Sequence, residues 1–256
     1  MFRGASSFDQ PLNDWNTSNV ENMNSMFFEA SSFNQPLDKW DTSKVLSMAG
    51  MFYGASSFNQ KLPWNTSNVN AMDGMFMNAK VFNQSLSWDT SKVEKMDHMF
   101  DGAAKFNQPL NSWNTGKVTD MSYMFANALS FNQPLDSWDT SKVTSMNSMF
   151  SKASKFNGEI GKWNISNVTT MREMFKYAKA FNQPLKWNAN KATMMKYMFD
   201  GATAFNQDIS SWRDSSAPSV DADNMFRASG ISEANYCKVA STWNYSGSLG
   251  LSYTCN

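Results

Sequence analysis

The chain repeats itself along almost its whole length, and this repetition limits its possible folds more than any other feature. A Met-Phe pair begins at positions 1, 26, 51, 75, 99, 124, 149, 174, 198 and 225, so neighbouring copies lie 24 to 27 residues apart. A period of this length is typical of solenoids, in which each repeat forms one coil and becomes stable only when neighbouring coils stack on it. The sequence therefore predicts about nine to ten stacked coils.

Each copy divides into two halves of different character. From Val20 to Ala30 the apolar residues are spaced by three, four and three, which favours one face of a helix. The preceding Asn-Thr-Ser at 16–18 has the side chains that cap helix N-termini. The other half, Phe8 to Trp15, contains Pro11 and favours an extended segment or a very short strand. We expect an α/β fold, a right-handed leucine-rich-repeat-like solenoid with one short β or extended segment and one short helix per coil.

The last residues of the chain do not follow the repeat. The pattern stops after Phe226, so we expect a tandem-repeat solenoid over 1–226 and a C-terminal cap over 227–256. The two cysteines, Cys237 and Cys255, both lie in this final segment, which predicts a disulfide and an oxidising compartment. The chain begins in the middle of a repeat, and we expect it to be a fragment of a longer protein.

Three columns of identical residues run from coil to coil. The Asn of the Phe-Asn-Gln motif is expected to form an amide ladder that satisfies backbone groups between coils. The Trp column is either the edge of the core or an exposed ladder that stacks on sugar rings. The Thr column either caps the helices or forms a regular hydroxyl array that binds ice. The Thr column contains Thr17, Thr42, Thr66, Thr90, Thr115 and Thr140.

The repeat resembles that of a known family. Met-Phe-x-Gly-Ala-Ser-Ser-Phe, followed by Leu-x-x-Trp-[Asn/Asp]-Thr-Ser-x-Val-Thr-x-Met, is similar to the repeat of the BspA-family leucine-rich-repeat surface proteins. The resemblance covers residues 1 to about 226. It implies a leucine-rich-repeat-like solenoid, placement at the cell surface or outside the cell, and a role in adhesion or partner binding.

The sequence contains no pattern typical of an enzyme. Gly-x-Ser-x-Gly, His-Glu-x-x-His, phosphate-binding-loop and EF-hand motifs are all missing, and the single histidine, His98, does not suffice for a histidine-based metal site. The formal net charge of zero gives no electrostatic reason to expect nucleic acid as a partner. The sequence has no run of about 18 apolar residues, so it predicts no transmembrane helix. We expect no catalytic residue, metal, cofactor or nucleic-acid partner.

Candidate binding residues come from the columns that vary between coils. Phe28, Tyr53 and Met77 follow the Met-Phe pair on successive coils, while Tyr123 and Tyr197 precede it. Such a stripe either anchors a protein partner or packs between neighbouring coils. We expect a non-catalytic, extracellular or cell-surface binding and adhesion module for a protein or glycan. The alternatives are a structural segment of an extracellular fibre or coat, with self-association through the solenoid ends, and an ice- or polysaccharide-binding solenoid that uses the Thr or Trp ladder.

Overall fold

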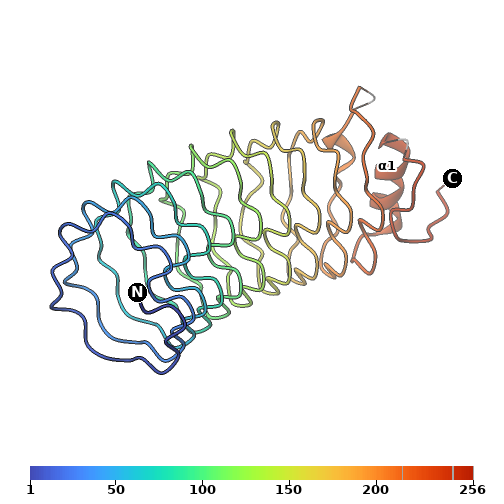
Figure 1. Ribbon diagram of the computed structural model, residues 1–256. Helices are drawn as coiled ribbons and strands as arrows, with labels where there is room; N and C mark the ends of the chain where they lie inside the picture. The colour runs from blue at the N-terminus through green and yellow to red at the C-terminus, as the bar shows by residue number, and fades with distance from the viewer. Residues whose placement is uncertain (215, 244, 256) are drawn as a thin grey trace.

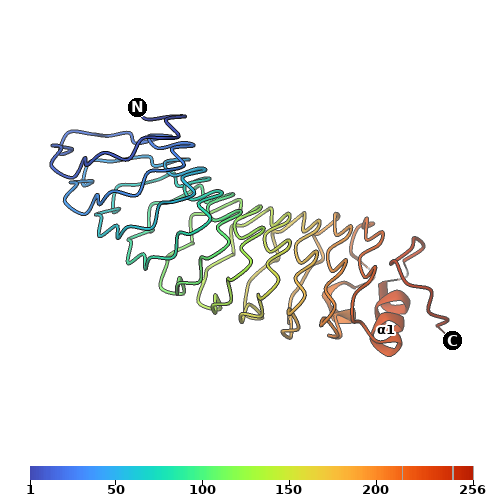
Figure 2. The same cartoon turned by 90° about the horizontal axis from the view of Figure 1, so that it is seen from below.

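The repeats form a stack of coils that is closed by a helix at the C-terminal end (Figure 1). The computed structural model describes residues 1–214, 216–243 and 245–255. The stack bends, and the planes of the coils turn gradually from one end to the other (Figure 2).

The predicted α/β architecture, with a helix and a strand in every coil, is wrong. The described residues contain one α-helix, α1 (Glu233–Trp243), one 3-10 helix, η1 (Ser210–Trp212), and no strand. Neighbouring coils are joined instead by isolated parallel β-bridges, one per pair of coils, from Asn22↔Ser47 to Met194↔Asp221.

The segment that was expected to be helical is a run of tight turns. In the coil that carries Met48 to Ala55, the N–H groups of Met51, Tyr53 and Ala55 donate to carbonyl oxygens three residues earlier. The N–H groups between them donate to the next coil, as Phe52 N does to the carbonyl oxygen of Met75 at 2.9 Å. A helix directs its N–H groups inward along its own axis and would leave the neighbouring coil unbound. We name this part of each coil the turn segment.

Two positions in each turn segment have left-handed backbone conformations, which a helix excludes. One directly precedes the Met-Phe pair, as Gly50 does (φ 59°), and the other is the second residue after the pair, as Gly54 is (φ 68°). Glycine adopts positive φ at no steric cost, which explains its frequency at these columns. Larger residues adopt the same conformation elsewhere, for example His98 (φ 57°) and Tyr123 (φ 59°). The glycines do mark a left-handed position, but within a turn and not at a helix end.

In the other half of each coil, side chains and not backbone ladders connect neighbouring coils. The stacked Trp rings keep these halves further apart than the strands of a β-ladder. The rings of Trp138 and Trp163 lie 6.3 Å apart between centroids, whereas paired strands lie about 4.8 Å apart. The side-chain amide oxygen of Asn83 accepts a hydrogen bond from Asn107 N at 2.9 Å. The indole Nε1 of Trp138 donates to the carbonyl oxygen of Leu110 at 2.9 Å. These contacts recur along the stack and confirm the predicted amide ladder.

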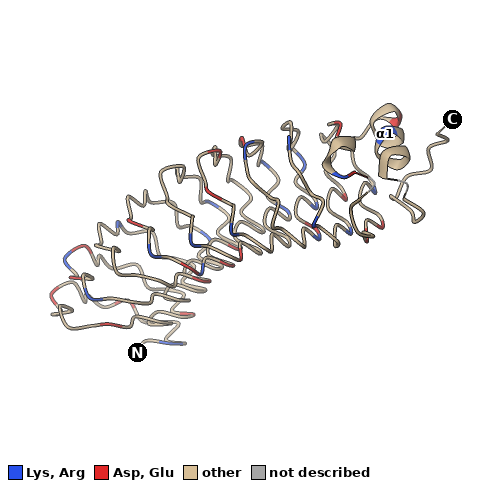
Figure 3. Cartoon of the chain, turned by 90° about the horizontal axis from the view of Figure 1, so that it is seen from above, with Lys and Arg blue, Asp and Glu red and all other residues tan. Residues whose placement is uncertain are grey.

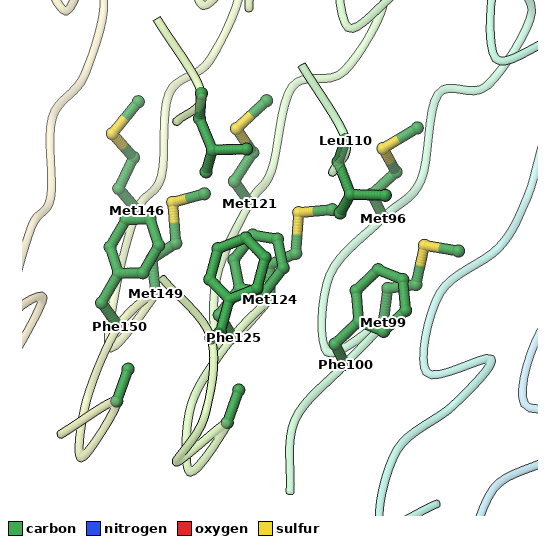
Figure 4. Close-up of a cluster of buried hydrophobic side chains, with 14 of the residues drawn as sticks. Met96, Met99, Phe100, Leu110, Met121, Met124, Phe125, Met146, Met149 and Phe150 are labelled. Carbon is green, nitrogen blue, oxygen red and sulfur yellow. The ribbon is translucent and has the colours of Figure 1, made fainter. Parts of the chain in front are cut away.

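Methionine and phenylalanine columns fill the interior (Figure 4). Met96, Met99 and Phe100 are fully buried, and so are their equivalents in the neighbouring coils. The rings of Phe100 and Phe125, on the turn side of the core, lie 5.6 Å apart. This spacing is smaller than the 6.3 Å of the Trp column, so the coils crowd together on the turn side. The turn side is therefore the inner side of the bend.

Helix α1 takes the place of the next coil at the C-terminal end. The amide ladder ends where Ser232 N donates to the side-chain oxygen of Asn206 at 2.9 Å. The Trp ladder continues into α1, because Trp243 Nε1 donates to the carbonyl oxygen of Ser210 at 3.1 Å. Terminal units of this kind shield the edge of the last repeat.

The tail after α1 closes the turn side of the same edge. Asn224 N donates to the carbonyl oxygen of Ser248 at 2.7 Å, so the tail accepts the hydrogen bond that a further coil would accept. The predicted disulfide between Cys237 and Cys255 is present and ties the tail to α1. The division of the chain into a solenoid and a separate cap stays a prediction.

Candidate functional site

Three columns of side chains vary from coil to coil and border the turn segments; we name them together the turn face. Column A, two residues before each Met-Phe pair, contains Asn24, Ala49, Asp73, Asp97, Ser122, Asn147, Arg172, Lys196 and Asp223. Column B, directly before the pair, contains Ser25, Gly50, Gly74, His98, Tyr123, Ser148, Glu173, Tyr197 and Asn224. Column C, directly after it, contains Phe28, Tyr53, Met77, Asp101, Ala126, Ser151, Lys176, Asp200 and Arg227.

The predicted aromatic stripe lies at the N-terminal end of the turn face. The rings of Phe28 and Tyr53 stack with centroids 4.3 Å apart, and the guanidinium of Arg3 lies 4.6 Å from the centroid of Phe28. Met77 follows on the next coil and is partly exposed. The stripe thus packs between coils, as one of the two predicted roles requires, and it also reaches the surface; the anchoring of a protein partner stays a prediction.

The other two predicted residues are separate from this stripe. Tyr123 is 39% exposed and stacks on His98, with ring centroids 4.5 Å apart. Tyr197 lies further along the stack among cations: the ammonium of Lys176 is 5.1 Å from its ring centroid and the guanidinium of Arg227 is 5.3 Å from it. The structure therefore does not bring the five predicted residues into one site.

A shallow hollow of about 420 Å³ opens beside Tyr53. It exists because column B has glycine at two successive coils, Gly50 and Gly74, so that no side chain fills the space. A Cβ atom built on Gly74 would meet no other atom within 4 Å. The remaining lining residues include Tyr53, Met77, Asp73, Asp97 and His98.

The hollow carries unbalanced negative charge. Partial burial, with repulsion from Asp73 and Asp120, raises the pKa of the Asp97 carboxyl. In the part of the chain that the structure describes, neither Asp73 nor Asp97 takes part in an ion pair. A hydrogen bond to Asp101, at 3.2 Å, raises the pKa of His98. A cationic guest would relieve the crowding of the carboxylates.

Cations gather at the opposite end of the turn face, beside the carboxylates of Glu173, Asp200 and Asp223. Lys196 lies 5.5 Å from the ring centroid of Tyr197, and Arg172 on the coil before is largely exposed. Arg227 donates to the buried carboxylate of Asp200 at 2.6 Å, which raises the pKa of the guanidinium further. Charged residues are spread along the whole stack (Figure 3), and on the turn face these two clusters lie toward opposite ends.

The Thr and Trp ladders do not face solvent. The hydroxyl of each predicted Thr donates to a carbonyl oxygen of the next coil, as Thr115 does to Asp139 at 2.9 Å. These threonines are 1% to 5% exposed, and the Trp residues from Trp40 to Trp212 are 1% to 6% exposed. Among the described residues of the repeats, the one Trp open to solvent is Trp15 in the first coil, which is 42% exposed. The Thr column, namely Thr17, Thr42, Thr66, Thr90, Thr115 and Thr140, neither caps helices nor forms an exposed array.

The sequence-based choice of site residues missed the charged members of the turn face. Asp73, Asp97, Arg172 and Lys196 stand in one column, and reading that column from coil to coil would have found them. These four residues are far apart along the chain, and only the stacking of the coils makes them neighbours in one column.

A family comparison places the chain among repeat proteins. The model of the family described as "Mycoplasma protein of unknown function, DUF285" matches three times, over residues 1–86, 62–153 and 133–243. The chain belongs to this family. Membership in DUF285 supports the predicted class of repeat protein, and it does not extend to leucine-rich repeats, adhesion or secretion. No curated protein and no solved structure matches the chain.

The described residues hold no group of three or more His, Cys, Asp or Glu side chains arranged for a metal ion. No helix among them has the length and apolar composition to cross a membrane. Every buried side-chain nitrogen or oxygen of this part of the chain has a hydrogen-bond partner.

Proposed function

We propose that this DUF285 chain is a non-catalytic binding module, at the cell surface or secreted, and that the turn face recognises a protein partner. The observation that carries the proposal is the hollow beside Tyr53, in which Asp73 and Asp97 form no ion pair with any described residue. An apolar ring beside unpaired carboxylates suits a basic side chain. The coils beneath are joined by recurring hydrogen bonds of the turn segments and of the Asn, Thr and Trp columns, so the surface is pre-organised for binding.

A protein partner fits this surface better than a glycan. Sugar rings stack on open aromatic faces, whereas the faces of Phe28 and Tyr53 cover each other at 4.3 Å. Arg3 already lies over Phe28 at 4.6 Å, which illustrates how a guanidinium packs against this column. Ice or polysaccharide binding through the Thr or Trp ladder is not proposed, because both columns are buried.

Placement outside the cell rests on other support. The resemblance of the repeat to the BspA-family surface proteins favours it, and so does the disulfide between Cys237 and Cys255, a bond that persists in oxidising compartments. The structural-fibre alternative has less support, because α1 and the tail cover the C-terminal edge that end-to-end growth would need.

The test is a selection of short random peptides displayed on phage against the immobilised chain. We expect enriched peptides to combine Arg or Lys with an aromatic residue. An Asp73→Asn/Asp97→Asn variant removes the negative charge at nearly constant shape and should weaken binding roughly five- to thirtyfold, from about 0.5–1 kcal/mol per ion pair.

A matched control changes the same two charges away from the turn face. An Asp38→Asn/Glu159→Gln variant, in the half of the coils opposite the turn segments, should bind the enriched peptides like the unmodified chain. A failure to enrich peptides contradicts the proposal. Equal binding by the Asp73/Asp97 variant, or a glycan-array signal that survives in it, contradicts it as well.

A further inference from the structure

Between Asp73 and Lys196, column A has carboxylates toward one end and cations toward the other. When the stack is turned end for end, each of these carboxylates takes the place of a cation. From the N-terminal side the column runs through two carboxylates, two neutral polar residues and two cations: Asp73, Asp97, Ser122, Asn147, Arg172 and Lys196. We propose that a second copy of the chain docks on the turn face in the antiparallel direction and forms a two-fold symmetric dimer. This inference rests on the proposed role of the turn face in recognition and names its partner.

The two-fold axis would pass between the coils that carry Ser122 and Asn147, perpendicular to the stack. Asp97 of one copy then faces the second copy's Arg172, and Asp73 faces the second copy's Lys196. Symmetry generates each pair twice, because a two-fold interface uses the same patch on both copies. Among the described residues Asp73, Asp97 and Lys196 are in no ion pair, and Arg172 lies 3.6 Å from the carboxylate of its sequence neighbour Glu173.

Column B is complementary in shape under the same symmetry. Gly74, where the hollow of about 420 Å³ opens, comes opposite Tyr197 of the second copy. That ring brings Lys176 with it, whose ammonium lies 5.1 Å from the ring centroid, and the hollow is acidic. In the next pair of column B, His98 meets the second copy's Glu173. The same register therefore pairs opposite charges in column A and places the ring of Tyr197 opposite the hollow at Gly74.

The bend of the stack is compatible with this contact. The turn face is the inner side of the bend, so two copies approach each other more closely where Asp73 meets Lys196 than at the axis. Near the axis the surfaces leave room, and there the exposed ring of Tyr123 faces the small Ser148 of the second copy. Charged contacts at both ends and a ring at the centre fill the interface.

The test uses two full-length variants with opposite charge changes. An Asp73→Lys/Asp97→Lys variant makes the charges at positions 73, 97, 172 and 196 all positive, and an Arg172→Asp/Lys196→Asp variant makes these four all negative. By sedimentation velocity we expect the unmodified chain to dimerise and each variant alone to associate at least tenfold more weakly. An equimolar mixture of the two variants should dimerise again, because every facing pair is then attractive. Recovery in the mixture also shows that both variants are folded.

A control pair carries equal charge changes outside the turn face. Asp38→Lys/Glu159→Lys and Lys142→Asp/Lys186→Asp variants should each dimerise like the unmodified chain. Mixing these two control variants should give no association beyond that.

Cross-linking tests the direction of packing. A chain with both Asp97→Cys and Arg172→Cys should form a covalent dimer on mild oxidation. Asp97→Cys alone should not, because in the antiparallel arrangement the two copies of position 97 lie three coils, or about 14 Å, apart.

Several results would overturn the dimer. An unmodified chain that stays monomeric at high concentration rules it out, and the peptide selection then still decides whether the turn face binds a different protein. Dimers that persist in both charge variants, or efficient cross-linking through Asp97→Cys alone, place any dimer contact elsewhere or in a parallel direction. Failure of the peptide selection together with a charge-dependent dimer would confine the turn face to self-recognition.

Discussion

The amide ladder allows us to test whether the accepting oxygen of each Asn, and not the rest of its side chain, holds neighbouring coils together. The side-chain oxygen of Asn83 accepts hydrogen bonds from Asn107 N at 2.9 Å and from Gln108 Nε2 at 3.0 Å. An Asn83→Ala change removes both bonds and leaves a partly buried backbone donor without a partner. At about 1 kcal/mol per bond, the free energy of unfolding should fall by about 2 kcal/mol.

An aspartate at the same column is the matched comparison. Asp9 occupies this position in the first coil, and its carboxylate accepts the hydrogen bond from Asn34 N at 2.9 Å. An Asn83→Asp change keeps the acceptor oxygen, and at neutral pH it should cost less than about 0.5 kcal/mol. The two variants therefore differ in stability although both lose the same NH₂ group.

Urea unfolding measures the two free energies, and hydrogen exchange of the Asn107 amide localises the effect. We expect this amide to exchange faster in the alanine variant and to stay protected in the aspartate variant. If the aspartate variant is as unstable as the alanine variant, the accepting oxygen is not what holds neighbouring coils together, and our account of the ladder is refuted.

Three further predictions concern other contacts of the stack. Trp138→Phe keeps a buried ring but loses the indole N–H that bonds to the preceding coil, and it should lower the free energy of unfolding in urea by about 1 kcal/mol. Reduction of the disulfide between Cys237 and Cys255 should destabilise the C-terminal end by up to about 3 kcal/mol, seen as faster hydrogen exchange there while the central coils stay protected. Hydrogen bonds from Ser141 lower the pKa of Asp139 below 3.8, so its contribution to stability is present above that pH and is lost as the pH falls through the lowered value; Asp139→Asn should remove this part of the acid sensitivity in urea titrations.

The repeat length and the buried columns could be predicted from the sequence, because each follows from one residue type at one spacing. Burial of the Met and Phe columns and the disulfide required no knowledge of backbone conformation. The helix prediction failed for a specific reason: the three- and four-residue steps from Val20 to Ala30 also describe the inward positions of consecutive turns. The decisive signal was Gly50 and Gly54, four residues apart, because a left-handed position at each end of a Met-Phe pair excludes a helix.

The strand prediction failed because side chains set the distance between coils. Stacked rings at about 6 Å hold the extended halves further apart than strands can pair, and amide side chains bridge the gap. The charged residues of the candidate site could not be predicted from their order along the chain either. Asp97 and Arg172 are 75 residues apart, and only the stacking of coils puts them in one column.

The turn segments have an electrical consequence for the whole molecule. In almost every coil, the N–H groups of the turn segment that bond to the next coil point toward the C-terminal end of the stack. The carbonyl oxygens that accept these bonds point toward the N-terminal end, as in the bond from Phe125 N to Met149 O at 2.9 Å. Aligned peptide dipoles add, as they do along a helix axis. The turn side thus has its partial negative pole at the N-terminal end and its positive pole at the α1 end, opposite in sense to an α-helix. Two such stacks side by side attract when they run in opposite directions and repel when they run in the same one.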